Sequence, residues 1–136
     1  MWQERWTHET TGRSTHNLIP NIREWIERSH GNVGYYMTQF LTNHGSFNQY
    51  LCRFNLRSNA ICESCGALEE TADHIIFECP KWINARRALN SNLGETIAAE
   101  NIIKIMLKSE NDWNRCENYI NTVIKERCSI PPNLPR

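Results

Sequence analysis

Three cysteines and one histidine in the middle of the chain have the spacing of a metal site. The side chains of Cys62, Cys65, His74 and Cys79 follow the pattern C-x2-C-x8-H-x4-C. Zinc in structural sites is held by four thiolate or imidazole ligands in a tetrahedron. Because four protein ligands leave no open position for water, the pattern predicts a structural zinc site and not a catalytic one. The alternative is a pair of buried thiols beside an unrelated histidine and cysteine.

Local signals indicate how the two halves of this pattern could face one ion. Gly66 directly follows the first cysteine pair and permits a tight turn. His74 and Cys79 are five positions apart, which is near one and a half turns of an α-helix. We therefore expect an irregular or helix-end segment that directs both side chains at the same point.

Length and charge are those of one small domain without a strong electrostatic character. The chain has 136 residues, with 15 Lys and Arg against 15 Asp and Glu, so its net charge is zero. This balance argues against a simple electrostatic nucleic-acid binder, which is normally basic. No apolar run approaches the length of a membrane span, and the N-terminus lacks the apolar core of a signal peptide. We expect neither a membrane nor a small-molecule substrate as a partner.

The other cysteines follow no such pattern. Cys52, Cys116 and Cys128 lie outside it. The last two, if they share one helix, are about 18 Å apart, which is too far for a disulfide. Three thiols without a disulfide pattern are typical of a reducing, intracellular compartment.

Apolar residues at helical spacing predict an all-α fold. We expect about six or seven helices, packed as a small helical domain with one structural zinc-knuckle turn. The expected division is a helical N-terminal part over 1–57, a CCHC zinc knuckle over 58–82, C-terminal helices over 83–128 and a disordered tail over 129–136. The expected helices cover residues 2–6, 20–31, 36–44, 47–54, 80–89, 96–107 and 112–128 approximately.

Charge is distributed unevenly around the cysteines. Between residues 58 and 82 the carboxylates outnumber a single cation, Lys81, and three thiolates on a divalent zinc add one more negative charge. This segment is therefore predicted to repel phosphate. Its acidic residues are Glu63, Glu69, Glu70, Asp73 and Glu78, and the basic flanks hold Arg5, Arg13, Arg23, Arg28, Arg53, Arg57, Arg86, Arg87, Lys104 and Lys108.

Four side chains on these flanks are candidates for nucleic-acid contacts. Arg13 and His16 lie in a polar stretch, GRSTHN, that lacks an apolar period and is predicted to be an exposed loop. Arg86 and Arg87 lie on the helix that leaves the zinc segment. The alternative for each is an ordinary solvated charge.

No combination of residues predicts an enzyme. His16, His30 and His44 are available, but none has the spacing of a nucleophile, base and carboxylate. We therefore expect no catalytic activity.

A longer ordered string resembles a known family. It runs from GRSTHNLIPNIREW through QFL, HG and YL to CESCG and ETADHIIFECPKW. This string resembles the C-terminal region of insect non-LTR retrotransposon polyproteins, in which a CCHC zinc-knuckle segment follows the reverse transcriptase. The resemblance covers nearly the whole chain, from Trp2 to about Arg127. Two positions depart from the family pattern: Ser14 stands where an aromatic residue is usual, and Asn43 where glycine is usual.

The resemblance implies a function. It implies a non-catalytic accessory domain that positions template RNA or target DNA beside the reverse transcriptase during target-primed insertion, in the nucleus. Neither the aromatic-Ala-Asp-Asp motif of the polymerase nor an endonuclease segment is present. The alternative is a protein-interaction scaffold that docks on the reverse transcriptase body, or a domesticated stand-alone relic. Net neutrality and the acidic cysteine segment favour this alternative.

Overall fold

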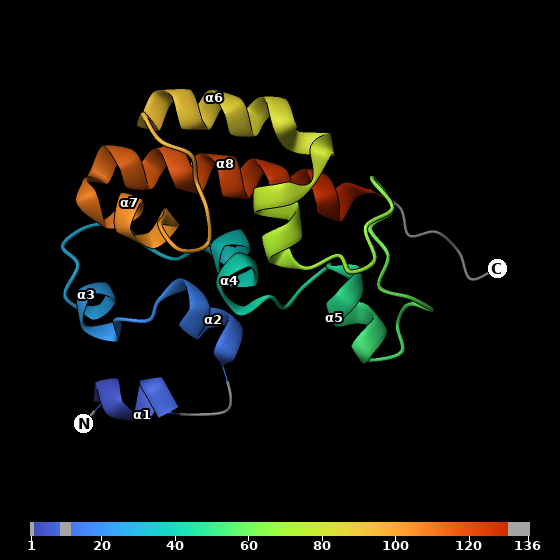
Figure 1. Cartoon of the computed structure of the whole chain (residues 1–136), viewed down its shortest axis with the longest axis horizontal. Coiled ribbons are helices and arrows are strands. Elements are labelled where there is room, and N and C mark those ends of the chain that lie inside the picture. The colour runs from blue at the N-terminus through green and yellow to red at the C-terminus, as the bar shows by residue number, and fades with distance from the viewer. Residues whose placement is uncertain (1, 9–11, 131–136) are drawn as a thin grey trace.

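The computed structural model describes residues 2–8 and 12–130, which are helical and irregular and contain no strand (Figure 1). The predicted all-α fold is therefore confirmed. A π-helical turn, η1 (His74–Glu78), and a 3-10 turn, η2 (Pro80–Trp82), follow the first cysteine pair. The α-helices are α1 (Trp2–His8), α2 (Arg13–Leu18), α3 (Ile22–Ile26), α4 (Tyr35–Thr42), α5 (Asn48–Arg53), α6 (Ile83–Leu93), α7 (Ile102–Lys108) and α8 (Glu110–Ser129).

Helix α8 is the axis of the fold. Its N-terminus is capped by Ser109, whose Oγ accepts a hydrogen bond from the amide of Asp112 at 3.1 Å, and the adjacent carboxylate complements the helix dipole. Helices α4, α6 and α7 and the π-helical turn η1 all pack against α8. Figure 1 shows α6 along one side of α8, with α7 and α4 on the other. The buried stripe of α8 comprises Trp113, Cys116, Tyr119, Ile120, Val123, Ile124 and Arg127.

The first three helices form a small layer at the edge of the domain, where α1 packs on α3 and α2 packs on α4. Trp6 of α1 donates its indole N–H to the carbonyl of Ile19 at 2.5 Å. Helix α3 starts two residues later than expected, at Ile22 and not at Pro20, because Asn21 caps it. The Asn21 Oδ1 accepts hydrogen bonds from the amides of the first turn, so Pro20 lies just outside the helix.

A cluster of aromatic rings joins this layer to α8. The rings of Trp25 and Trp113 are 5.5 Å apart, and the Arg28 guanidinium lies 4.3 Å from the Trp25 centroid. Gly31 has a φ of +92°, and a Cβ at this position would overlap the Trp113 ring. Gly31 was expected to end a helix, but α3 already ends at Ile26. The glycine instead makes room for a tryptophan.

The segment before α7 is irregular although a helix was expected from about residue 96. The side chains of Asn90 and Asn101 accept hydrogen bonds from the amides of Ile97 and Ala98, at 2.9 and 2.7 Å. These bonds replace helical ones and delay the helix to Ile102. None of the helices in the described part is both long and apolar enough to cross a membrane. Of the expected tail, 131–136 lies outside the described residues.

Candidate metal centre

The structure brings the four predicted ligands together. The ligand atoms of Cys62, Cys65, His74 and Cys79 all lie within 4.8 Å of one another. The sulfurs of Cys62 and Cys79 are 3.9 Å apart, and the Cys65 sulfur is 3.2 Å from the His74 Nε2. Ligands of a tetrahedral thiolate site are separated by about 3.8 Å when each metal–sulfur bond is about 2.3 Å. The group could therefore hold a metal ion.

The first cysteine pair is held by a tight turn. The amide of Gly66 donates to the carbonyl of Cys62 at 2.7 Å, and the amide of Cys62 donates to the carbonyl of Ala67 at 2.9 Å. Gly66 has a φ of +82°, in the left-handed region that side chains other than glycine rarely adopt. The predicted role of this glycine follows from that conformation. Two thiols separated by two residues then face the same side of the turn.

The second pair depends on the π-helical turn η1. In an α-helix, residues five apart point about 140° away from each other. Here the amide of Cys79 donates to the carbonyl of His74 at 2.7 Å, an i to i+5 bond that widens the turn. This wider turn returns Cys79 to the side of His74. It is the irregular helix-end segment that the spacing predicted.

Burial decides the charge of the thiols. Cys62, His74 and Cys79 are buried, whereas Cys65 is exposed. Burial raises the pKa of Cys62 to about 12 and also raises the pKa of Cys79. Both thiols therefore stay protonated at neutral pH in the absence of a cation. A metal ion would supply the positive charge that stabilises their thiolates.

A carboxylate orients the histidine. The Nε2 of His74 faces the cysteines, and its Nδ1 lies 3.5 Å from a carboxylate oxygen of Glu78. Metal-binding histidines commonly direct their second nitrogen to such a group, which fixes the tautomer and the ring orientation. From the sequence, Glu78 was predicted to be one of several surface charges. The signal that was missed is its position four residues after a histidine within one helical segment.

Arg86 is an interior residue of the centre. It is buried and donates hydrogen bonds to the carbonyls of Cys79 and Ile76, at 2.8 and 3.0 Å. The hydroxyl of Tyr119 donates to the same Ile76 carbonyl at 2.7 Å. Arg86 thus satisfies the carbonyls that the π-helical turn leaves without helical partners. This differs from the predicted nucleic-acid contact, because the guanidinium does not face solvent, whereas Arg87 is exposed.

Glu70 is interior as well, although it was predicted to belong to the acidic surface. Its side chain is fully buried, and its Oε1 accepts hydrogen bonds from Arg127 at 2.6 Å and from the amide of Asn48 at 2.9 Å. The backbone of Glu70 also donates to the carbonyl of Ala60 at 2.7 Å. Because Glu70 is buried, the surface of this segment carries one carboxylate fewer than expected and is less acidic.

Arg13 and His16 lie in helix α2, so the prediction that they belong to an exposed loop is wrong. Arg13 donates to the carbonyls of Trp6 and Thr7, at 2.6 and 3.3 Å, and its guanidinium lies 5.7 Å from the Trp6 ring. The ring of His16 is 5.5 Å from the same tryptophan. Both side chains are half-buried and join α2 to α1. Figure 1 places α2 and α6 on opposite sides of α8, so the four predicted contact residues do not form one surface.

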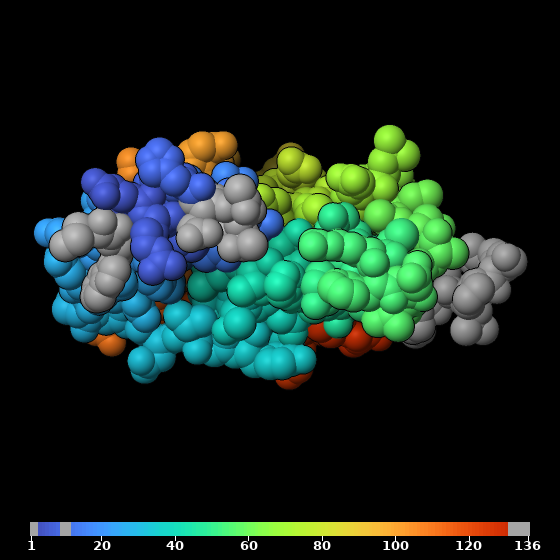
Figure 2. Space-filling model, turned by 90° about the horizontal axis from the view of Figure 1, so that it is seen from below, coloured from blue at the N-terminus to red at the C-terminus, as the bar shows by residue number. Residues whose placement is uncertain are grey.

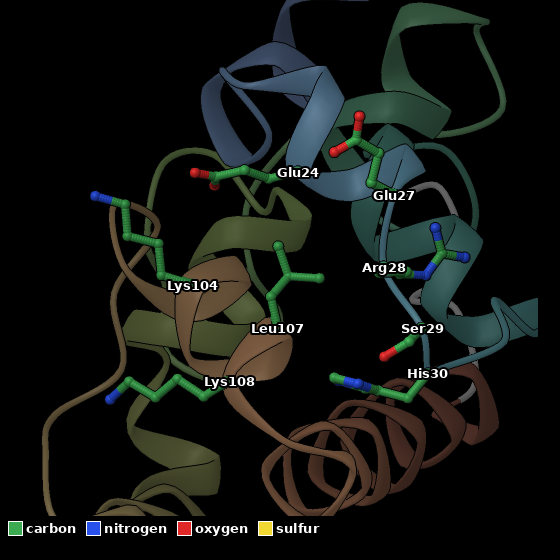
Figure 3. Close-up of a pocket in the computed structure, with 8 residues that line it drawn as sticks. All are labelled: Glu24, Glu27, Arg28, Ser29, His30, Lys104, Leu107 and Lys108. Atoms are coloured by element: carbon green, nitrogen blue, oxygen red, sulfur yellow. The ribbon is translucent and has the colours of Figure 1, made fainter.

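Two lysines of the basic flank line a groove of mixed charge. Lys104 and Lys108 of α7 line an open groove of about 500 Å³ together with Glu24, Glu27 and Arg28 (Figure 3). Lys108 also pairs with Glu95 at 2.9 Å, and this hydrogen bond raises the pKa of the lysine. The carboxylates offset the lysines, so the groove is a poor site for phosphate.

Comparisons with known proteins find retrotransposon polyproteins that are similar to this chain at modest identity. It is 36% identical over 86 residues to a retrovirus-related Pol polyprotein of the type-1 retrotransposable element R1 from Bradysia coprophila, with 63% of this chain and 8% of that protein covered. Two R1 Pol polyproteins of Nasonia vitripennis are 26% and 24% identical over 88% and 98% of this chain. The chain spans 30% and 32% of those proteins. No protein-family model and no solved structure matches it.

Proposed function

We propose that this chain is a non-catalytic, nucleic-acid-binding accessory domain of a non-LTR retrotransposon polyprotein. Its role is to position template RNA or target DNA during target-primed reverse transcription. The observation that carries the proposal is a closed set of four metal ligands in a chain similar to R1 Pol polyproteins over most of its length. A set of ligands without an open position suits a structural task and not hydrolysis.

The metal of this proposal is zinc. Three thiols and one imidazole are the ligands that zinc prefers in structural sites, and calcium or magnesium would require oxygen ligands. Bound zinc would join the Gly66 turn to η1, and η1 is joined through Arg86 to α6 and α8. In this proposal the ion stiffens the module that carries the binding surface and does not itself touch nucleic acid.

Among the predicted contacts, Arg87 fits the proposal best. It is exposed on α6, one residue from the arginine that supports the metal centre. Arg13 and His16 are half-buried, so they would contribute at the edge of a bound strand. Arg86 acts indirectly, because its donors are already used by carbonyls.

Binding as a function of salt tests this proposal. Wild-type protein is titrated into fluorescent single-stranded RNA and DNA at several salt concentrations, with and without chelator. We expect affinity to fall steeply with salt, because each phosphate contact releases counterions. Arg87→Ala should reduce the slope by roughly 0.7 to 0.9. Glu69→Lys is the control at an exposed position and should leave binding unchanged or strengthen it. Absence of salt-dependent binding in the wild type contradicts the proposal.

A second function, docking on the reverse transcriptase body, is favoured by one observation. Leu56, Ile61 and Leu68 expose 62%, 40% and 82% of their surfaces in and just before the metal-binding segment. Exposed aliphatic side chains of this kind are typical of protein interfaces. Two results together would support this second function. The wild type would bind the polymerase region of the polyprotein but no nucleic acid, and Leu68→Glu would lose the binding to the polymerase region.

A further inference from the structure

A long central segment of this neutral chain carries no negative charge. No Asp or Glu lies between Glu27 and Glu63, and the charged residues inside that interval are Arg28, Arg53 and Arg57. Because the whole chain has equal numbers of acidic and basic residues, its carboxylates are concentrated elsewhere. The helices of this interval, α4 and α5, therefore present a surface on which phosphate meets little local repulsion.

Aromatic rings form a ladder on this surface. The rings of His44 and Tyr50 are stacked, with centroids 4.6 Å apart and planes 24° from parallel. The ring of Phe54, the residue that caps the end of α5, follows at 4.9 Å from Tyr50, with its plane tilted by 58° from that of Tyr50. Phe54 keeps 54% of its surface exposed, and the guanidinium of Arg53 lies 5.9 Å from its ring. A large ring that is more than half exposed beside two other rings offers aromatic surface for one more ring.

A groove continues from the ladder along α4. It has a volume of about 640 Å³, and its wall contains backbone and hydroxyl groups together with His44 and Tyr50. At its far end Tyr35 exposes 74% of its surface. Figure 2 shows α4 and α5 side by side across this face of the molecule, in cyan and green. The lining residues are Val33, Gly34, Tyr35, Thr38, Gln39, Thr42, His44, Gly45 and Tyr50, and none is acidic.

We propose that this face binds a single strand of nucleic acid. This inference rests on the proposed function and adds a contact surface to the one at Arg87: unpaired bases stack on Phe54 and Tyr35, and Arg53 contacts a phosphate. Proteins hold single strands without reading their sequence by combining aromatic platforms with cationic side chains. Here Arg53, beside Phe54, supplies the cation, and the lining of the groove contains no Lys or Arg. A duplex does not fit this chemistry, because its bases are already stacked on each other. The aliphatic cluster of Leu56, Ile61 and Leu68 lacks aromatic rings and is better suited to protein.

The test compares variants that remove one contact each. Phe54→Ala and Arg53→Ala change exposed side chains, so both proteins should fold as wild type does, and circular dichroism checks this. Binding is measured by fluorescence anisotropy with single-stranded oligouridine, oligothymidine and a duplex of equal length. We expect Phe54→Ala to weaken single-strand binding by about 5- to 100-fold without changing its salt slope. Arg53→Ala should reduce the salt slope by roughly 0.7. Leu68→Ala is the matched apolar control and should bind as wild type does.

A second readout locates the strand directly. Photocrosslinking of oligonucleotides that carry 5-iodouracil should yield adducts on Phe54, Tyr50 or Tyr35, mapped by mass spectrometry. If wild type binds single strands but Phe54→Ala binds equally well and the adducts map elsewhere, this surface is wrong and the proposed function stands. If wild type binds no nucleic acid, both fail. Tighter binding of the duplex than of the single strands would also overturn the inference.

Discussion

Arg127 and Glu70 form a buried ion pair, with the Arg127 Nη2 2.6 Å from the Glu70 Oε1, although 57 positions separate them in the chain. Their side chains expose 6% and 0% of their surfaces. Arg127 also donates to the Oδ1 of Asn48 at 3.2 Å, and the Asn48 side chain donates to the carbonyl of Ile61 at 2.8 Å. The pair thus ties the end of α8 to the start of α5 and to the segment that carries the metal ligands.

Removal of one partner of this pair should be strongly destabilising. Arg127→Met leaves the Glu70 carboxylate buried without its cation, so we expect the free energy of unfolding to fall by about 3–5 kcal/mol. Urea denaturation followed by circular dichroism measures this change. Arg115→Met is the matched control, because Arg115 pairs with Asp112 at an exposed position at 3.2 Å. The control should cost less than about 1 kcal/mol. Equal losses in the two variants would contradict a special role for the buried pair.

Loss of the metal should unfold the domain. Structural zinc commonly contributes about 10 kcal/mol or more in apparent binding free energy, which is comparable to the whole stability of a typical domain. We expect one zinc per chain by elemental analysis, and a largely unfolded protein after chelation. Cys62→Ser should lose metal and helicity together, whereas Cys52→Ser, at a half-buried thiol outside the centre, should retain both. A metal-free wild type of equal stability would refute the zinc site.

Cys116 should be chemically inert in the folded protein. Burial raises its pKa from 9.0 to about 12, so at pH 8 it is a neutral thiol and not the reactive thiolate. Iodoacetamide at pH 8 should therefore modify the exposed Cys128 and leave Cys116 unmodified until denaturant is added. Peptide mass spectrometry distinguishes the two sites. Rapid modification of Cys116 in the native protein would contradict the burial of this thiol on α8.

Because the pKa of Cys116 is raised, the free energy of unfolding depends on pH in the alkaline range. The folded state holds the Cys116 proton more tightly than the unfolded state does. This contribution to stability is fully present below pH 9 and is lost as the pH rises towards about 12. Cys116→Ala should flatten the dependence of the free energy of unfolding on pH above 9. A slope that is identical in wild type and variant would exclude this origin.

Gly31 should not tolerate a side chain. Alanine there must adopt a φ of +92° and place its Cβ against the Trp113 ring. We expect Gly31→Ala to lower the free energy of unfolding by about 2–4 kcal/mol, through backbone strain and overpacking together. Gly34→Ala is the control, because nothing lies within 4 Å of a Cβ built at that glycine. Thermal melts of the two variants should differ by several degrees, and coincident melts would contradict the packing of Trp113.

The features that could be predicted from the sequence are those that depend only on the types and spacing of residues close together in the chain. Cys62, Cys65, His74 and Cys79 lie within one short segment, and their chemistry and spacing are enough to predict that they converge. The apolar period from Trp113 to Ile124 likewise predicts the buried face of α8, because each helical turn repeats it. These signals predicted the all-α fold and the candidate metal centre.

The features that only the tertiary structure decided concern polar residues whose partners depend on how the segments pack. Arg86 and Glu70 were predicted to be surface charges, and both are buried with partners: Arg86 donates to the carbonyls of Ile76 and Cys79, and the Glu70 Oε1 accepts from Arg127 of α8. A buried charge requires such partners, and no local sequence pattern reports that a π-helical turn will direct its carbonyls at Arg86 or that Arg127, 57 positions away, will meet Glu70. The groove beside His44 and Tyr50 was also decided by the tertiary structure, because its wall forms where α4 meets the start of α5.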